Sequence, residues 1–483
     1  MKKPLILIVL AVAIASILLA TCCDYQGSVW GKFKNPETET MLKRFVAMKI
    51  KQANASANNL PPEFQTMFKY AQRGDWLALS NSVRELDARI EYRDSLGYGI
   101  QHWHGFRGAV EDFISGAAEQ IGLHWEPQPP PRLQGTPGEA IKEIYGALDG
   151  FVTGDEKYSA EFGRDIIASI PAGSIYFGGS DSGRYIVTAM CQSQVNGDPF
   201  FTLAQNALGN NGYRQYLRNM YGKIIYIPMD GDSQKCHEKF MEDSERRMSS
   251  NQSPSVMYSV MYTEELLAKI VFDNNSNHEF YVNESYPIDW MYPRLEPNGL
   301  IFKLDRQPAA TLSDETVQRD HEYWTNYIRP MIGDWLNENT SIAEIAAFAE
   351  KTYGRRDFRG FKGDPRYIQN AYSQRTFSKS RAAIAGLYGW HADHAANPAD
   401  KEHMLREADF AFRQAWALGP CSPEPVFRYV YFLVAQSRLN DALVVGETDM
   451  FILRMRGVDN EQLEDMVKQL KDKQSQNPPV DQR

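Results

Sequence analysis

One loop carries residue types that could bind an anion. It follows the apolar run Ile175–Phe177 and precedes an amphipathic segment, so it is expected to join a strand to a helix. Free backbone N–H groups and the helix dipole favour an anion there, and Arg184 could add a bidentate contact. Asp181 would compete with such a ligand, so the alternative is a structural tight turn. The candidate ligand-binding residues are Gly178, Gly179, Ser180, Asp181 and Arg184.

Two acids, Glu284 and Asp289, accompany the aromatic segment Tyr286–Pro293. A pair of carboxylates could act as general acid and base, and a ring-lined pocket would suit a sugar. The alternative interpretation is that Trp290 and its neighbours are core aromatics. Neither interpretation assigns a catalytic residue.

The histidines offer two groups that could bind a metal. His102 and His104 are separated by one residue, and His391, His394 and His403 follow later in the chain. Zinc requires three or four convergent ligands, and the spacing gives no sign of convergence. We therefore expect solvent-exposed histidines, no metal and no cofactor.

The N-terminus indicates export. Lys2 and Lys3 precede an uncharged apolar run from Pro4 to Cys23, which is typical of a signal peptide or a membrane anchor. Leu19–Cys22 resembles a bacterial lipobox. A lipoprotein signal, an uncleaved anchor and a cleaved signal all remain open. Each alternative places residues 24–483 outside the cytoplasm, at the cell membrane or in the periplasm.

The length and charge limit the function classes. A chain of 483 residues is expected to form about three domains. The formal net charge of -9 argues against nucleic acid as a partner, because such proteins concentrate Lys and Arg on one face. The membrane remains a partner through the N-terminal segment alone.

The candidate loop requires strands and helices in alternation. Predicted strands at Ile175–Phe177, Phe200–Ala204 and Ile224–Ile227 are separated by helical patterns, which is typical of a parallel sheet with crossover helices. Further predicted strands are Val256–Tyr262, Phe280–Val282 and Leu300–Leu304. The expected fold class is a Rossmann-like α/β core, with a mostly parallel sheet and helices on both faces, flanked by an N-terminal all-α module and a C-terminal helical repeat module.

The expected domain order follows from these patterns. The segments are a signal or anchor (1–23), an N-terminal helical module (37–125), a Pro-rich linker (126–138), the α/β core (139–310), a helical connection (311–375), helical repeats (376–470) and a disordered tail (471–483).

The C-terminal module matches the spacing of tetratricopeptide repeats. Ala408, Phe412, Ala415 and Pro420 fit the second helix of one repeat. The positions that continue the register are Val426, Tyr429, Leu433 and Ala442. Repeats of this kind stack and present a face to peptides or partner helices, so a protein partner is expected. The alternative is an ordinary helical bundle.

Several segments together carry a family resemblance. In order, they are Ile175–Arg184, Gln205–Leu208, Ile225–Pro228, Glu284–Tyr286, Trp290–Pro293 and Gly299–Ile301. They resemble the extracytoplasmic C-terminal region of bacterial membrane proteins of the protein O-mannosyltransferase-like family, whose chains often end in tetratricopeptide repeats. The resemblance implies Asn206 as a further ligand-binding candidate and a membrane glycosyltransferase complex as a partner. The family's glycosyl transfer is associated with a many-helix membrane domain, so an independent transferase is not expected here.

Two functional hypotheses follow. The first is an extracytoplasmic binding or scaffold protein, with repeats for a protein partner and an α/β domain for a small anionic or sugar-like ligand. The second is an enzyme or accessory subunit of glycan or nucleotide-sugar metabolism, working at Asp181 and Arg184 with Glu284 or Asp289.

Overall fold

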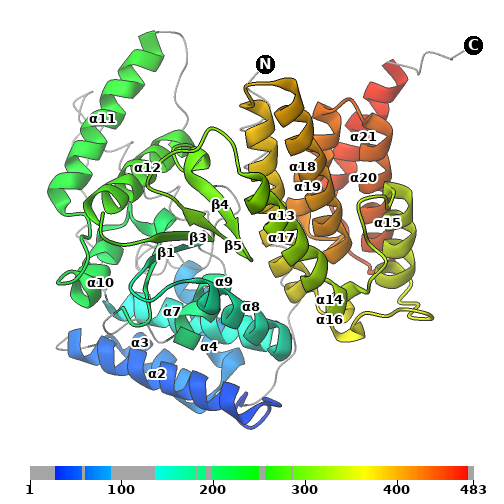
Figure 1. Ribbon diagram of the computed structural model, residues 1–483. Coiled ribbons are helices and arrows are strands. Elements are labelled where there is room, and N and C mark those ends of the chain that lie inside the picture. The colour runs from blue at the N-terminus through cyan, green and yellow to red at the C-terminus, as the bar shows by residue number, and fades with distance from the viewer. Residues whose placement is uncertain are drawn as a thin grey trace, which may run out of the picture. The chain divides into compact units, whose positions relative to one another are not determined.

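The computed structural model describes residues 28–56, 60–88, 136–179, 182–191, 197–249, 256–283 and 287–476 (Figure 1). The chain divides into an N-terminal unit, residues 23–283, and a C-terminal unit, residues 284–483. The predicted signal or anchor, most of the predicted Pro-rich linker, and His102 and His104 lie outside the described residues. Among the helices in the described ranges, none is both long and apolar enough to cross a bilayer.

Helices dominate the N-terminal unit. They are α2 (Pro36–Ser56), α3 (Pro62–Arg73), α4 (Trp76–Ala88), α7 (Thr136–Val152), α8 (Glu156–Ser169), α9 (Ser182–Cys191), α10 (Asn211–Tyr221), α11 (Asp230–Ser249) and α12 (Val256–Asn274). Local sequence sets several of their ends. Gly74 ends α3 in the left-handed conformation (φ 68°), which glycine adopts without a steric penalty. Asp155 and Asn210 cap α8 and α10 through their side chains.

Three short strands lie within this unit. They are β1 (Ile175–Gly178), β2 (Phe201–Ala204) and β3 (Phe280–Asn283). β1 pairs in parallel with both β2 and β3, so that Ile175 lies opposite Phe201 on one side and Phe280 on the other. Every residue of β1 and β2 is buried, including the polar Thr202, in agreement with the mainly apolar character of both strands.

Helices α7 and α9 pack closely because α7 carries a glycine at their contact. A Cβ atom at Gly146 would lie 2.1 Å from the Tyr185 ring, so any larger side chain must displace that ring. We expect Gly146→Ala to lower the free energy of unfolding by about 1–3 kcal/mol through overpacking. Urea unfolding measures this change. The matched control is Gly231→Ala in α11, where no atom lies within 4 Å of the added Cβ. Equal effects of the two substitutions would contradict the prediction.

The C-terminal unit begins with a short hairpin and continues as helices. β4 (Leu295–Asn298) and β5 (Ile301–Leu304) pair antiparallel, and Gly299 adopts a φ of 65° in the turn between them. The helices are α13 (Asp314–Tyr327), α14 (Arg329–Ile332), α15 (Ile342–Ala349), α16 (Pro365–Gln369), α17 (Ala371–Asp393), α18 (Pro398–Leu418), α19 (Pro423–Ala435), α20 (Leu439–Met455) and α21 (Glu461–Gln476). Ser341 and Glu344 form a capping box at the start of α15, which the spacing Ser-x-x-Glu in the sequence predicts.

Helices α17 to α21 form what we call the helical array. Each helix packs against the next along the chain, and α17 also packs against α19 (Figure 1). The positions that matched the repeat pattern in the sequence are all buried: Ala408, Phe412, Ala415, Pro420, Val426, Tyr429, Leu433 and Ala442. The periodicity therefore identified the side chains that face the interior of the array.

The expected fold class is wrong. The residues that the structure describes are mainly helical, and each strand among them is four residues long, so they form no Rossmann-like core with a mostly parallel sheet. Val256–Tyr262, predicted as a strand, is the first part of α12, and Ile224–Ile227 follows α10 without forming a strand. A short apolar run fits a strand and a buried helical turn equally well by periodicity. In α12 the helix-favouring residues that follow the run decide the outcome.

Candidate functional site

The predicted loop is only partly described. Gly178 ends β1 and is buried together with Gly179, whereas Ser180, Asp181 and Glu284 lie outside the described residues. Asn206 is half-buried in the 3-10 turn η1 (Gln205–Ala207). Asp289 belongs to the C-terminal unit, where it is exposed.

Arg184 points into the interior of the N-terminal unit. Its side chain is 4% exposed, and its guanidinium lies 4.1 Å from the centre of the Tyr185 ring. A Cβ at Gly178 would come within 2.6 Å of Arg184 Cγ, so the glycine gives the arginine room. Burial alone would lower the pKa of Arg184, but Tyr185, Tyr213 and the acids of α7 outweigh it and the pKa is raised.

The acids near Arg184 belong to a buried ionic cluster that sequence reasoning missed. Lys49 of α2 forms an ion pair with Glu143 of α7, and the hydroxyl of Tyr216 donates to Glu143 at 2.7 Å. A second pair, Lys142 with Glu139 at 2.7 Å, is also buried. One sequence signal was available, because Lys49 lies on the apolar stripe of α2. The charges of these two lysines and two glutamates are therefore paired with one another inside the unit.

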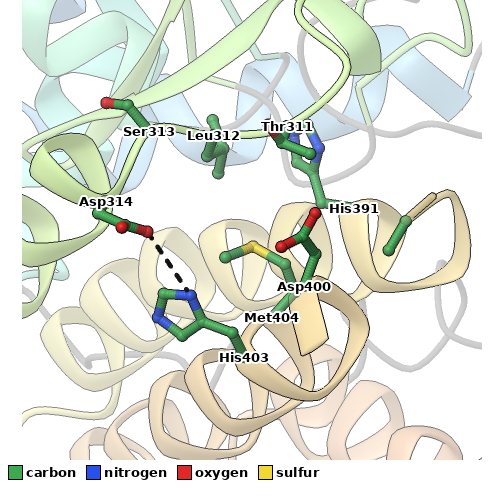
Figure 2. A pocket seen from close by; sticks show the side chains of 9 residues that line it. Thr311, Leu312, Ser313, Asp314, His391, Asp400, His403 and Met404 are labelled. Atoms are coloured by element: carbon green, nitrogen blue, oxygen red, sulfur yellow. Dashed lines mark ion pairs between the residues drawn. The ribbon is translucent and has the colours of Figure 1, made fainter. Parts of the chain in front are cut away.

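A pocket of about 260 Å³ lies in the C-terminal unit (Figure 2). It is bounded by the segment that leads into α13, the end of α17 and the first turns of α18. Its lining residues are Thr311, Leu312, Ser313, Asp314, His391, Ala395, Asp400, His403 and Met404. None of the candidate residues named from the sequence as ligand-binding lies in this lining.

Helix caps position the polar lining. Ser313 caps α13 by accepting from the Thr316 N–H, which places Asp314 in the first turn. Asn397 caps α18 in the same way, and its side-chain amide donates to Asp400 Oδ2 at 2.7 Å. The two carboxylates therefore lie at the positive ends of two helix dipoles, which stabilise them as anions.

His391 forms part of the pocket wall and is only 2% exposed. Neither ring nitrogen makes a hydrogen bond in the described residues. Burial lowers the pKa of His391 to about 4, and the contact of the ring with the Ala310 backbone opposes the shift. The imidazole is therefore neutral at pH 7.

His403 faces Asp314 across the pocket, with 3.8 Å between Nδ1 and Oδ1 (Figure 2). Its Nε2 lies 3.9 Å from Glu407, which also accepts from His321 at 3.2 Å. The hydrogen bond to Glu407 raises the pKa of His321 despite its partial burial. A carboxylate thus links two histidines of this region.

The expectation of exposed histidines is wrong for His391 and holds for His394. His391 is buried because it lies in the last turns of α17, which packs against α18. No group of three or more His, Cys, Asp or Glu side chains converges as a metal site in the part of the chain that the structure describes.

The buried, neutral His391 predicts acid sensitivity. Its pKa in the folded protein lies below the ordinary value of 6.5, so the unfolded chain binds the proton first as the pH falls. The contribution of neutral His391 to the free energy of unfolding is therefore fully present above pH 6.5. This contribution is lost between pH 6.5 and about 4, by about 3 kcal/mol in total. We expect His391→Gln to reduce this loss, as measured by urea unfolding at pH 7.5 and 4.5. His237→Gln, at an exposed position of α11, is the control, and an unchanged pH dependence in His391→Gln would refute the assignment.

Comparisons of the chain with protein-family models, with curated proteins and with solved structures found no match. The resemblance to the O-mannosyltransferase-like family therefore rests on the sequence segments alone.

Proposed function

We propose that the protein is an extracytoplasmic binding protein, exported or held at the membrane by its N-terminal segment, whose helical array docks a protein partner. The observation that supports this most is the consecutive packing of α17 to α21 around the buried repeat positions. Helix-pair arrays of this kind use the face formed by the first helices of successive pairs to bind peptides or partner helices.

The candidate docking face comprises the partly exposed side chains that α17 and α19 share. Lys379 of α17 lies 3.8 Å from Glu424 of α19, and Gly386 leaves space for Arg428 to lie across α17. Tyr431, one turn further along α19, is half-buried. Half-buried aromatic and arginine side chains are the types that most often carry binding energy at protein interfaces. We call these five residues the array face.

The resemblance of the sequence to the protein O-mannosyltransferase-like family supports a membrane glycosyltransferase as the partner. In that arrangement the protein would serve as an accessory subunit, and the chemistry would belong to the partner. This identity is a proposal that the following experiment tests directly.

A photo-crosslinking amino acid introduced at Tyr431, in the cells that make this protein, tests the proposed function. We expect one discrete adduct whose second component is an integral-membrane glycosyltransferase. Arg428→Glu should abolish the adduct, whereas Arg454→Glu, the same charge reversal at an exposed position of α20, should not. The same crosslinker at Lys51, an exposed position of α2, should give no such adduct.

Three results would contradict the proposal. They are no adduct from Tyr431, equal adducts from Lys51, and an adduct unaffected by Arg428→Glu. A discrete adduct with a protein of another class would support docking by the array face and reject the glycosyltransferase as its partner.

A further inference from the structure

His321 of α13 lies between two carboxylates. Its Nδ1 is 3.2 Å from Oε2 of Glu407 in α18, and its Nε2 is 3.1 Å from Oε1 of Glu338. Glu338 belongs to residues 333–341, which join α14 to α15 and which we call the α14–α15 connection. The ring also stacks on Phe410 of α18, with 4.8 Å between the two ring centres. One histidine side chain therefore links α13, α18 and the α14–α15 connection.

This geometry depends on the charge of the ring. An imidazolium carries an N–H on both nitrogens, whereas a neutral imidazole carries one N–H and one lone pair. Only the protonated form of His321 can therefore donate to both carboxylates at once. The hydrogen bond to Glu407 raises the pKa of His321, and the charges of Glu407 and Glu338 add to the shift. The partial burial of the ring and the charge of Arg381 oppose it.

The two carboxylates differ in their exposure to water. The side chain of Glu407 is 16% exposed, whereas that of Glu338 is 68% exposed. A carboxylate that is largely buried loses more free energy when it gives up its donor, because water cannot replace the lost hydrogen bond. When His321 releases one proton to water, we therefore expect it to keep the Nδ1–H that faces Glu407. The lone pair of Nε2 then faces the carboxylate of Glu338, and the two acceptors repel each other.

Arg413 of α18 holds the backbone of the α14–α15 connection independently of His321. Its guanidinium donates to the carbonyl oxygens of Glu338 and Thr340, at 2.8 and 2.7 Å. An arginine in a protein stays protonated, so these two hydrogen bonds persist when His321 loses its proton. The pH-sensitive contact is therefore confined to the side chain of Glu338, and the connection as a whole stays in place.

Other charged groups of the neighbouring elements have partners of their own. Arg381 of α17 is paired with Asp320. On α18, His403 lies 3.9 Å from Glu407 and therefore shares that carboxylate with His321 at a longer distance. The remaining contacts are those of His403 with Asp314, Arg319 with Thr316, Glu322 with Gln318, and Glu296 of β4 with Asp305 and Lys303.

We propose that His321 acts as a pH-sensitive latch, which ties the side chain of Glu338 to α13 when the ring is protonated and releases it to the solvent when the ring is neutral. The pKa of His321 is raised in the folded protein. The contribution of the latch is therefore fully present below the ordinary value of 6.5 and is lost as the pH rises through the folded pKa. The loss assigned to His391 lies below pH 6.5, so the two effects occupy different pH ranges. The proposal does not depend on the array face.

Hydrogen exchange of the full-length protein, followed by mass spectrometry between about pH 6 and pH 9, tests the latch. The measured quantity is the protection factor of the amides in the α14–α15 connection, which corrects for the effect of pH on intrinsic exchange. We expect protection about threefold higher at the acidic end, since a partly exposed ion pair gives an effect of this size.

Matched variants assign the pH dependence to the latch. Glu338→Gln should abolish the difference in protection, because it removes the charge, and its exposed position leaves the fold intact. His321→Gln should abolish the difference as well. Glu322→Gln, an exposed acid at the next position of α13, should retain it, and so should His403→Gln.

Nuclear magnetic resonance of the protein with 13C-labelled histidine follows the ring itself. The His321 signal, identified by its absence from His321→Gln, should titrate above pH 6.5 in the wild type and at a lower pH in Glu407→Gln and Glu338→Gln. Three outcomes would overturn the proposal. They are equal protection across the pH range, a difference that persists in Glu338→Gln or His321→Gln, and a His321 ring that titrates at or below pH 6.5.

Discussion

Replacing Asp320 with alanine is expected to destabilise the C-terminal unit by about 3–5 kcal/mol, the usual cost of removing one partner of a buried ion pair. Arg381 is 0% exposed and donates to Asp320 at 2.6 Å. It also donates to Gln414 at 2.8 Å and lies over the Trp324 ring. Without Asp320, a guanidinium charge remains in the interior, and the hydroxyl of Tyr388 loses its acceptor.

The measurement is urea unfolding followed by tryptophan fluorescence, because the buried Trp324 lies beside the pair. Glu315→Ala, an exposed acid in the first turn of the same helix, is the matched control and should change stability by less than about 1 kcal/mol. The double variant Asp320→Leu with Arg381→Met should recover most of the loss, since an apolar pair of similar volume avoids the cost of burying charge. A loss below 1 kcal/mol in Asp320→Ala would contradict the role given to the pair.

Replacing Lys49 with alanine is expected to destabilise the N-terminal unit by a similar amount, about 3–5 kcal/mol. Lys49 is 0% exposed, and its ammonium donates to the hydroxyl of Tyr216 at 2.5 Å and pairs with Glu143. Burial lowers the pKa of Lys49, although Glu143 opposes the shift. The substitution leaves the Glu143 carboxylate in the interior with Tyr216 as its remaining donor among the contacts described above.

Hydrogen exchange followed by mass spectrometry locates this loss. Peptides from α2, α7 and α10 should lose protection in Lys49→Ala, because those helices supply the three members of the network. Lys51→Ala, an exposed position two residues away, should leave protection unchanged. Lys49→Met combined with Glu143→Gln should restore most of the protection. Retained protection in α7 after the single substitution would disprove the dependence of that helix on the ion pair.

Local sequence signals predicted many elements correctly. The strands at Ile175–Phe177 and Phe280–Val282 and the capping box at Ser341 lie where the sequence placed them. Such signals depend on residues within a few positions of one another, so no tertiary contact is needed to read them. These local signals did not determine the fold class. The apolar run Val256–Tyr262, for example, predicts a strand but forms the first part of α12.

The candidate sites show the same difference between local sequence signals and tertiary contacts. The loop at Gly178 is predicted as a candidate site because glycines, a strand and an arginine occur together in the sequence. The burial of the Arg184 side chain was not predicted, because it depends on interactions with Tyr185 and with acids of α7. The pocket as a whole was missed because its residues come from three separate segments, and only His391 and His403 among them were considered in the sequence, as possible metal ligands.

By itself, the sequence determined the capping box that begins α15, which positions of the helical array are buried, and where several of the strands lie. Only the tertiary structure decided which charged side chains enter the interior. The partners that make such burial tolerable lie far away along the chain, 167 residues for Lys49 and Tyr216 and 61 residues for Arg381 and Asp320. A charge leaves water only where a partner is already in place, and that condition exists only once distant helices have packed together.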